Sequence, residues 1–270
     1  MESGIAVNNI TVLLHKEWLE LRQQRALLLS IIFVPLLLTL IPLVLLYAIG
    51  HTPSKGDTDD FNQLVLRANP ALAGMSQAEL GQAMMGQAFS SMFLLLPMLL
   101  PSIIASYSIV GEKTNRTLEP LLATPIKTWE LLAGKILAAL LPAMLLTWLA
   151  GAIFVAGVWA SALSARVFAA IVSPGWLTVF LICTPLLALI AIAAMVAISS
   201  RVNDPRTAQQ FSAWVVVPFL MVFFSQITGL LVLSPLIALV AAIILAVIAG
   251  LAIWGVTALF QREVILTKWS

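Results

Sequence analysis

The chain has 270 residues, of which 61% are hydrophobic and only 10% are charged, whereas an ordinary soluble domain carries about 25% charged residues. A water-soluble protein of this size could not bury so much apolar surface in one core. The net charge of +2 is too small and too scattered to indicate a nucleic-acid-binding protein, and the single cysteine excludes an intramolecular disulfide framework.

Long stretches without Asp, Glu, Lys or Arg divide the chain, and each can hold at least one span, because a bilayer core about 30 Å thick needs about 20 apolar residues in a helix. The last stretch, from Arg206 to Arg262, is broken at Gly229, Ser234 and Pro235 and therefore holds two spans. We predict an all-α, polytopic membrane protein that forms one transmembrane domain over residues 1–270. Its six transmembrane helices lie near 27–49, 84–110, 134–160, 175–199, 211–232 and 236–260.

The segment 10–25, before the first span, has the pattern of an amphipathic helix. Its apolar residues recur along one face: Ile10, Leu13, Leu14, Trp18 and Leu21. Its charged and amide residues fall largely on the other face: Lys16, Glu17, Glu20, Gln23 and Gln24. We expect an interfacial helix on the inner membrane surface, with Trp18 at headgroup depth. Its candidate functional residues are Lys16, Glu17, Trp18 and Arg22.

The basic residues predict the orientation of the chain. Most of the 14 fall in the N-terminal segment, in 111–135, in 200–207 and in the C-terminal tail. Because positive charge is enriched in cytoplasmic loops, we predict cytoplasmic termini and an external loop at 50–83. A capping box at Ser76 and Glu79 predicts that a helix begins before the second span. Such a helix would project outside the membrane or bend at Pro97 and Pro101. The external loop itself is either a plain connector or a gating or docking element.

The polar segment 111–133, after the second span, carries helix signals. Thr117 can cap a short helix, and Thr124-Pro125 ends that helix and begins the next. A short helix with charges at its start and leucines on one face suits docking into a groove on a soluble partner. An ordinary internal loop is the alternative.

Two polar segments resemble a known family. The run Glu112-Lys-Thr-Asn-Arg-Thr-Leu-Glu-Pro-Leu-Leu-Ala-Thr-Pro125, followed by Trp129-Glu-Leu-Leu-Ala-Gly-Lys135, is similar to the signature loop of type-2 ATP-binding-cassette (ABC) exporter permeases. The stretch 199–210 resembles the loop between the fourth and fifth spans of that family. The six spans, the helix before them and the internal termini match the family plan, and the nearest subgroup is the sodium-efflux and multidrug-export type.

The resemblance implies a subunit of an exporter in the cell membrane of a prokaryote. The 111–133 segment would be a cytoplasmic coupling helix on a cytosolic ABC ATPase subunit, and 10–25 the connecting helix beside it. Substrate would pass outward between this chain and a second permease, identical or similar, in contact with membrane lipid. ATP and Mg would bind only the partner ATPase, so this chain holds no cofactor. The implied ATPase-coupling residues are Glu112, Thr117, Leu118, Glu119, Leu122, Thr124 and Pro125.

Other functions are less well supported by the sequence. Neither Gly-x-Ser-x-Gly nor His-Glu-x-x-His occurs, so an enzyme is not expected. Gly111-Glu-Lys-Thr114 and Gly134-Lys135 lack the spacing of a phosphate-binding loop. A secondary transporter, or a non-transporting membrane subunit of another complex, is the alternative. The interiors of the predicted spans carry no Asp, Glu, Lys or Arg, which disfavours a proton relay.

The translocation path is the least defined part of the sequence. Prolines within the spans predict local kinks that serve either packing or a path: Pro35, Pro42, Pro97, Pro101, Pro142, Pro185 and Pro218. Possible path residues combine adaptable methionines with a polar amide in an aromatic setting: Met92, Phe93, Met98, Phe223 and Gln226. Core packing and interhelical hydrogen bonding are the alternatives for these side chains.

Overall fold

The computed structural model describes residues 2–51, 72–114, 128–201, 210 and 235–259, and the regular structure in these ranges is helical without strands. In chain order the helices are α1 (Glu2–Gln23), α2 (Arg25–His51), α4 (Gln77–Met92), α5 (Leu96–Thr114), α7 (Thr128–Ser161), α8 (Ala165–Ile171), α9 (Pro174–Thr178), α10 (Thr184–Arg201) and α12 (Pro235–Leu259). A 3₁₀ turn, η2 (Phe93–Leu95), joins α4 to α5, and a π-helical turn, η3 (Val179–Cys183), joins α9 to α10.

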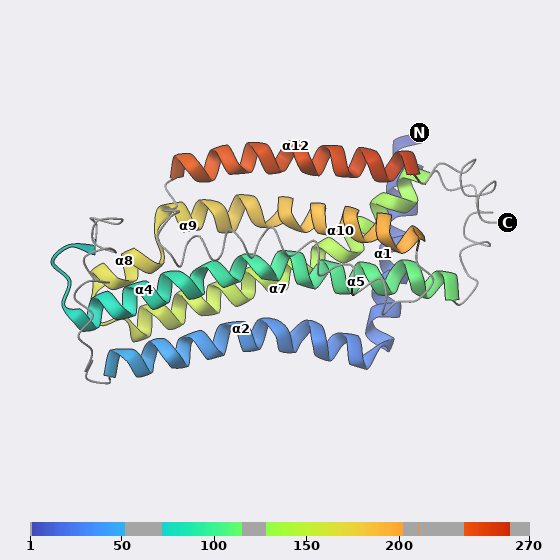
Figure 1. Ribbon diagram of the computed structural model, residues 1–270. Coiled ribbons are helices and arrows are strands. Elements are labelled where there is room, and N and C mark those ends of the chain that lie inside the picture. Colours follow the sequence, from blue (N-terminus) through green and yellow to red (C-terminus); the bar gives the residue numbers. More distant parts are fainter. Residues whose placement is uncertain (1, 52–71, 115–127, 202–209, 211–234, 260–270) are drawn as a thin grey trace.

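The long helices run side by side, and α1 lies across one end of the bundle (Figure 1). At this end, which we call the α1 end, α2 and α7 begin and α5, α10 and α12 finish. The short helix α8 lies at the opposite end, the α8 end, where α2 and α7 finish and α4 and α12 begin. The chain therefore crosses the bundle repeatedly, as a polytopic membrane protein does.

Five of the six predicted spans are confirmed. Helices long and apolar enough to cross a bilayer cover Leu28–His51, Gln77–Ala105, Trp129–Ser161, Ala165–Ser199 and Leu236–Ala258. The predicted span at 211–232 lies outside the described residues.

Three spans are longer than predicted, and the fourth begins at Ala165, ten residues before its predicted start. The second begins at Gln77, where Ser76 accepts a hydrogen bond from the Glu79 amide and Glu79 accepts one from the Ser76 amide, so the predicted capping box is confirmed. The third belongs to α7, whose 34 residues span about 51 Å at about 1.5 Å per residue. This length exceeds a hydrocarbon core of about 30 Å. The first turns of α7, residues 128–133, come from the polar segment.

Two of the span prolines coincide with a change of helix type. Pro97 has no N–H to offer Phe93 O, which instead accepts from the Leu96 amide in the 3₁₀ turn η2. The π-helical turn η3 ends two residues before Pro185. By contrast, the helices continue through the other described span prolines: Pro35 and Pro42 in α2, Pro101 in α5 and Pro142 in α7.

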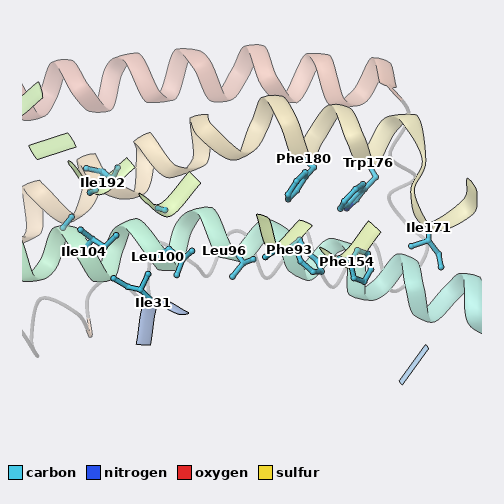
Figure 2. Close-up of a cluster of buried hydrophobic side chains, with 14 of the residues drawn as sticks. Ile31, Phe93, Leu96, Leu100, Ile104, Phe154, Ile171, Trp176, Phe180 and Ile192 are labelled. Atoms are coloured by element: carbon cyan, nitrogen blue, oxygen red, sulfur yellow. The ribbon is translucent and has the colours of Figure 1, made fainter. Parts of the chain in front are cut away.

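The centre of the bundle is packed by large apolar side chains. Phe93 and Phe154 lie with ring centroids 4.5 Å apart, and Trp176 stacks on Phe180 at 5.0 Å; Figure 2 shows these rings between the helices. A second cluster joins Leu94, Leu95 and Met98 to alanines of α12. The span at α4–α5 is 72% buried, whereas those in α2 and α12 are 22% and 17% buried. Most residues of the latter two helices therefore lie outside the buried core of the bundle.

Candidate functional site

The helix α1 crosses the first turns of α7 at close range. Leu13 of α1 is buried, and a Cβ atom placed on Gly134 would lie 3.0 Å from Leu13 Cβ. Such a contact is tighter than side chains normally make, so the glycine lets the two helices approach. The segment 10–25, which was predicted to be an interfacial helix, thus lies mostly in α1 and packs on the start of the third span.

A buried ion pair joins the same two helices. Lys135 Nζ donates a hydrogen bond to Glu17 Oε1 at 3.0 Å, and the two side chains are only 6% and 5% exposed. Glu130, in the first turn of α7, is also buried. Charges removed from water are tolerated when they are paired and hydrogen-bonded. The α1–α7 contact is therefore specific, because each buried charge needs the opposite charge as its hydrogen-bond partner.

The prediction that Glu17 lies on the polar outer face of α1 is wrong. Glu17 and Leu13 are four positions apart, so they share one face of the helix, and that face is buried against α7. Lys16 does lie at the surface, where its Nζ is 3.4 Å from Glu20 Oε1. Trp18 is 44% exposed, with the Arg22 guanidinium 5.3 Å from its ring. The predicted depth of Trp18 in the membrane remains a prediction.

Sequence reasoning missed Lys135 and Glu130 as functional candidates. In the sequence, both residues belong to the family motif Trp129–Lys135, and Lys135 is also a cytoplasmic charge beside the third span, but neither pattern assigns them a role. The available signal was the position of Lys135 at the start of a long apolar run, where a lysine is buried only if it has a partner. The identity of that partner was not accessible, because Glu17 is 118 positions away in the chain.

Most predicted coupling residues lie outside the described residues: Thr117, Leu118, Glu119, Leu122, Thr124 and Pro125. Glu112 belongs to the last turn of α5, for which only the backbone is described. The last turn of α5 and the first turns of α7, which precede and follow these residues in the chain, lie at the α1 end (Figure 1). The buried ion pair joins α1 to α7 at this same end.

The possible path residues occupy different environments. Phe93 is fully buried against Phe154, and Met98 lies in the second cluster. Met92 lines an apolar groove of about 360 Å³ between α2 and the α4–α5 span, together with Val34, Leu37, Leu38, Ile41, Pro42, Phe89 and Leu99. Phe223 and Gln226 lie outside the described residues. Of the three described residues, Met92 alone lines this groove, and the path assignment remains a prediction.

Comparison with protein families agrees with the geometry. The model of the ABC-2 family of transporter proteins matches residues 11–266, from α1 through all the described spans. Comparison with curated proteins gave no match.

Proposed function

Because the chain belongs to the ABC-2 family of transporter proteins, we propose that it is the permease subunit of an exporter driven by a separate cytosolic ATPase. Membership of the family makes it the membrane component of an ABC transporter. The proposal adds the direction of transport, the partner that hydrolyses ATP with Mg, and a second permease copy or similar permease across the path. The sodium-efflux and multidrug-export subgroup remains a prediction from the sequence.

The observation that carries the proposal is the arrangement at the α1 end. The coupling segment runs directly into α7, and α1 is fixed to the same part of α7 by the Glu17–Lys135 pair. A force applied by an ATPase to the segment 112–125 would act on the third span directly. The buried pair would make α1 follow that movement, so the two helices would respond as one element.

The orientation follows from the charges on the same end. Lys16, Arg22 and Lys135 all belong to α1 or to the start of α7. Basic residues of this kind are retained on the cytoplasmic side of a membrane. The α1 end would therefore be cytoplasmic, as an ATPase partner requires, and the 50–83 loop would be external.

A secondary transporter is the second candidate, and the positions of charges weigh against it. In the described spans, Asp, Glu, Lys and Arg occur only near an end: Glu79, Glu130, Lys135 and Arg166. Ion- and proton-coupled carriers place such groups deeper in the membrane, along the path of the ion. The described spans offer no charged relay near their middle.

Co-purification tests the proposed partnership. The parent chain should retain a cassette ATPase in mild detergent, and Glu119→Lys combined with Leu122→Asp should release it, because both changes fall in the predicted docking helix. Leu163→Ala, an exposed position at the α8 end, is the matched control and should retain the ATPase. Efflux of sodium and of a fluorescent amphiphilic dye should require ATP and the partner. Efflux that persists without any ATPase would refute the proposal.

A further inference from the structure

At the α8 end, one face of α4 is joined to the segment that connects α7 to η3 and α10. This connection comprises residues 162–178, contains α8 and α9, and includes the first part of the fourth span. Ser164 caps α8 by accepting from the Val167 amide, and Ser173 caps α9 by accepting from the Trp176 amide. The connection is therefore an ordered element with its own local hydrogen bonds, and we refer to it as the outer cap.

Gln82 is the centre of the contact between α4 and the outer cap. The residue is only 1% exposed. Its side-chain Nε2 donates hydrogen bonds to Leu46 O at 3.0 Å and to Ser161 O at 2.9 Å. Its Oε1 accepts from the Leu163 amide at 2.9 Å. Both N–H groups and the oxygen of the amide are thus used. One side chain therefore makes hydrogen bonds to α2, to the last residue of α7 and to the start of the outer cap.

Gly50 provides the space for this amide. A Cβ atom on Gly50 would lie 2.9 Å from Gln82 Nε2. This distance is shorter than a Cβ atom normally makes to another heavy atom. The absence of a side chain at this position lets the amide lie against the last turn of α2. The contact is therefore built from two positions, an amide on α4 and a glycine on α2.

Two further hydrogen bonds continue the contact along α4. Gln87 Nε2 donates to Ala170 O at 3.0 Å, and Trp176 Nε1 donates to Ser90 O at 2.9 Å. Next to the first of these hydrogen bonds, a Cβ atom on Gly86 would lie 2.4 Å from Ile171 Cγ1. The outer cap is thus held on α4 at its start, its middle and its end.

We propose that Gln82 is a positioning residue for transport, which holds the outer cap on α4 so that the α8 ends of α2, α4 and α7 stay together as one rigid unit. The exit of the substrate then opens elsewhere than between these helices. The helix α12 packs mainly on α10, α9 and η3, and its Ala238 and Ala242 belong to the apolar cluster that includes Leu94, Leu95 and Met98. Apolar contacts of this kind have little hydrophobic driving force within lipid, so movement is expected between α12 and these elements before it is expected between the outer cap and α4. The role in transport rests on the proposed function, whereas the rigid unit does not.

An engineered disulfide tests the rigid unit. In a Cys183→Ser background, Gly86→Cys is combined with Ile171→Cys. The distance from the Gly86 Cβ position to Ile171 Cγ1 is 2.4 Å, and a C–C bond adds about 1.5 Å. The two Cβ atoms therefore lie within about 3.9 Å of each other, near the typical disulfide value of about 3.8 Å.

The disulfide should form in membrane vesicles that contain this chain alone, which makes the result independent of any ATPase. It should form at the same rate in the complex without nucleotide and in the complex trapped with ATP and vanadate. The oxidised complex should still hydrolyse ATP. The proposal is overturned if no bond forms, if it forms in one nucleotide state only, or if oxidation stops ATP hydrolysis and a reductant restores it.

Gln82→Leu tests the residue itself. The rate of disulfide formation should fall by about fivefold or more, the factor expected when a net hydrogen-bond contribution is lost. ATP-driven efflux should also fall and should recover when the disulfide is formed, a rescue that general loss of structure would not show. Met85→Leu, at an exposed position on α4, should change neither rate.

Gly50→Ala gives a second route to the same result, because it displaces the amide without removing it. It serves if Gln82→Leu fails to insert in the membrane as a folded protein. Equal disulfide formation in the parent, Gln82→Leu and Gly50→Ala chains would show that the amide does not hold the outer cap. Loss of efflux in the parent chain, with normal disulfide formation, would instead count against the proposed function alone.

Discussion

Glu17 accepts a hydrogen bond from Lys135 at 3.0 Å, although the two residues are 118 positions apart and belong to different helices. Both side chains are almost completely buried. The pair connects α1, which lies across the bundle, to α7, which runs along it (Figure 1). The contact therefore fixes α1 to the start of the third span, close in sequence to the predicted coupling residues.

Loss of one partner of the pair should be costly. Glu17→Leu or Lys135→Met should lower the free energy of unfolding by about 3–5 kcal/mol, because each leaves a buried charge without its partner. The double variant Glu17→Leu with Lys135→Met should cost less than the sum of the single changes. Thermal unfolding in detergent, read as a double-mutant cycle, measures the coupling.

The ion pair of Lys16 and Glu20 on the same helix provides the control. Its two side chains are 35% and 45% exposed, and such pairs contribute about 0.3–0.5 kcal/mol. Lys16→Gln should therefore leave the unfolding temperature nearly unchanged. Equal effects at the two pairs would contradict the buried position of Glu17.

Gly151 should not tolerate a side chain. A Cβ atom at this position would lie 2.3 Å from Phe180 Cζ, so Gly151→Ala must displace a ring stacked on Trp176. Overpacking of this kind costs about 1–3 kcal/mol. Gly250→Ala, on α12, is the control because no atom lies within 4 Å of the added Cβ. It should be neutral or stabilising, and a stability loss at Gly250 alone would contradict the packing.

The two neighbouring path candidates should respond differently to truncation. Phe93 is fully buried against Phe154, so Phe93→Ala leaves a cavity and should lower the free energy of unfolding by about 3 kcal/mol or more. Met92 lines an open groove, and Met92→Ala should have a much smaller effect. The measurement is thermal unfolding of each variant, and the reverse order of stabilities would contradict the assigned burial.

The predicted orientation is tested by chemical labelling of intact cells. In a Cys183→Ser background, Gln23→Cys places a thiol on α1 and Ala165→Cys places one at the start of α8, both at exposed positions. An impermeant maleimide added outside should label the second and should label the first only after the membrane is opened. Labelling of the α1 position from outside would reverse the assignment.

The sequence predicted the features that depend on neighbouring residues. Runs of apolar residues located the five described spans, because a bilayer requires a helix of about 20 such residues wherever it occurs. The capping box at Ser76 and Glu79 was also predictable, since both of its hydrogen bonds form within one turn. The span prolines were a weaker guide, because irregular turns adjoin Pro97 and Pro185 while the helices run on through the other four described prolines.

Contacts between distant segments were not predictable in the same way. Helical periodicity divides α1 into faces, but it does not say which charge meets a partner, so Glu17 was placed on the wrong face. The role of Gln82 was not predictable, because the residues near it in the sequence do not indicate its three hydrogen-bond partners on α2, α7 and the outer cap. The same holds for Gly50, Gly86 and Gly134, each of which matters through a neighbour far along the chain.

Hydropathy and short polar motifs are properties of contiguous residues, so the sequence was enough to identify a helical membrane protein and to indicate its family. The attachment of α1 to the third span and of the outer cap to α4 became known only from the fold. Both attachments depend on buried polar groups, and such groups are stable only where the fold brings donor and acceptor together out of water.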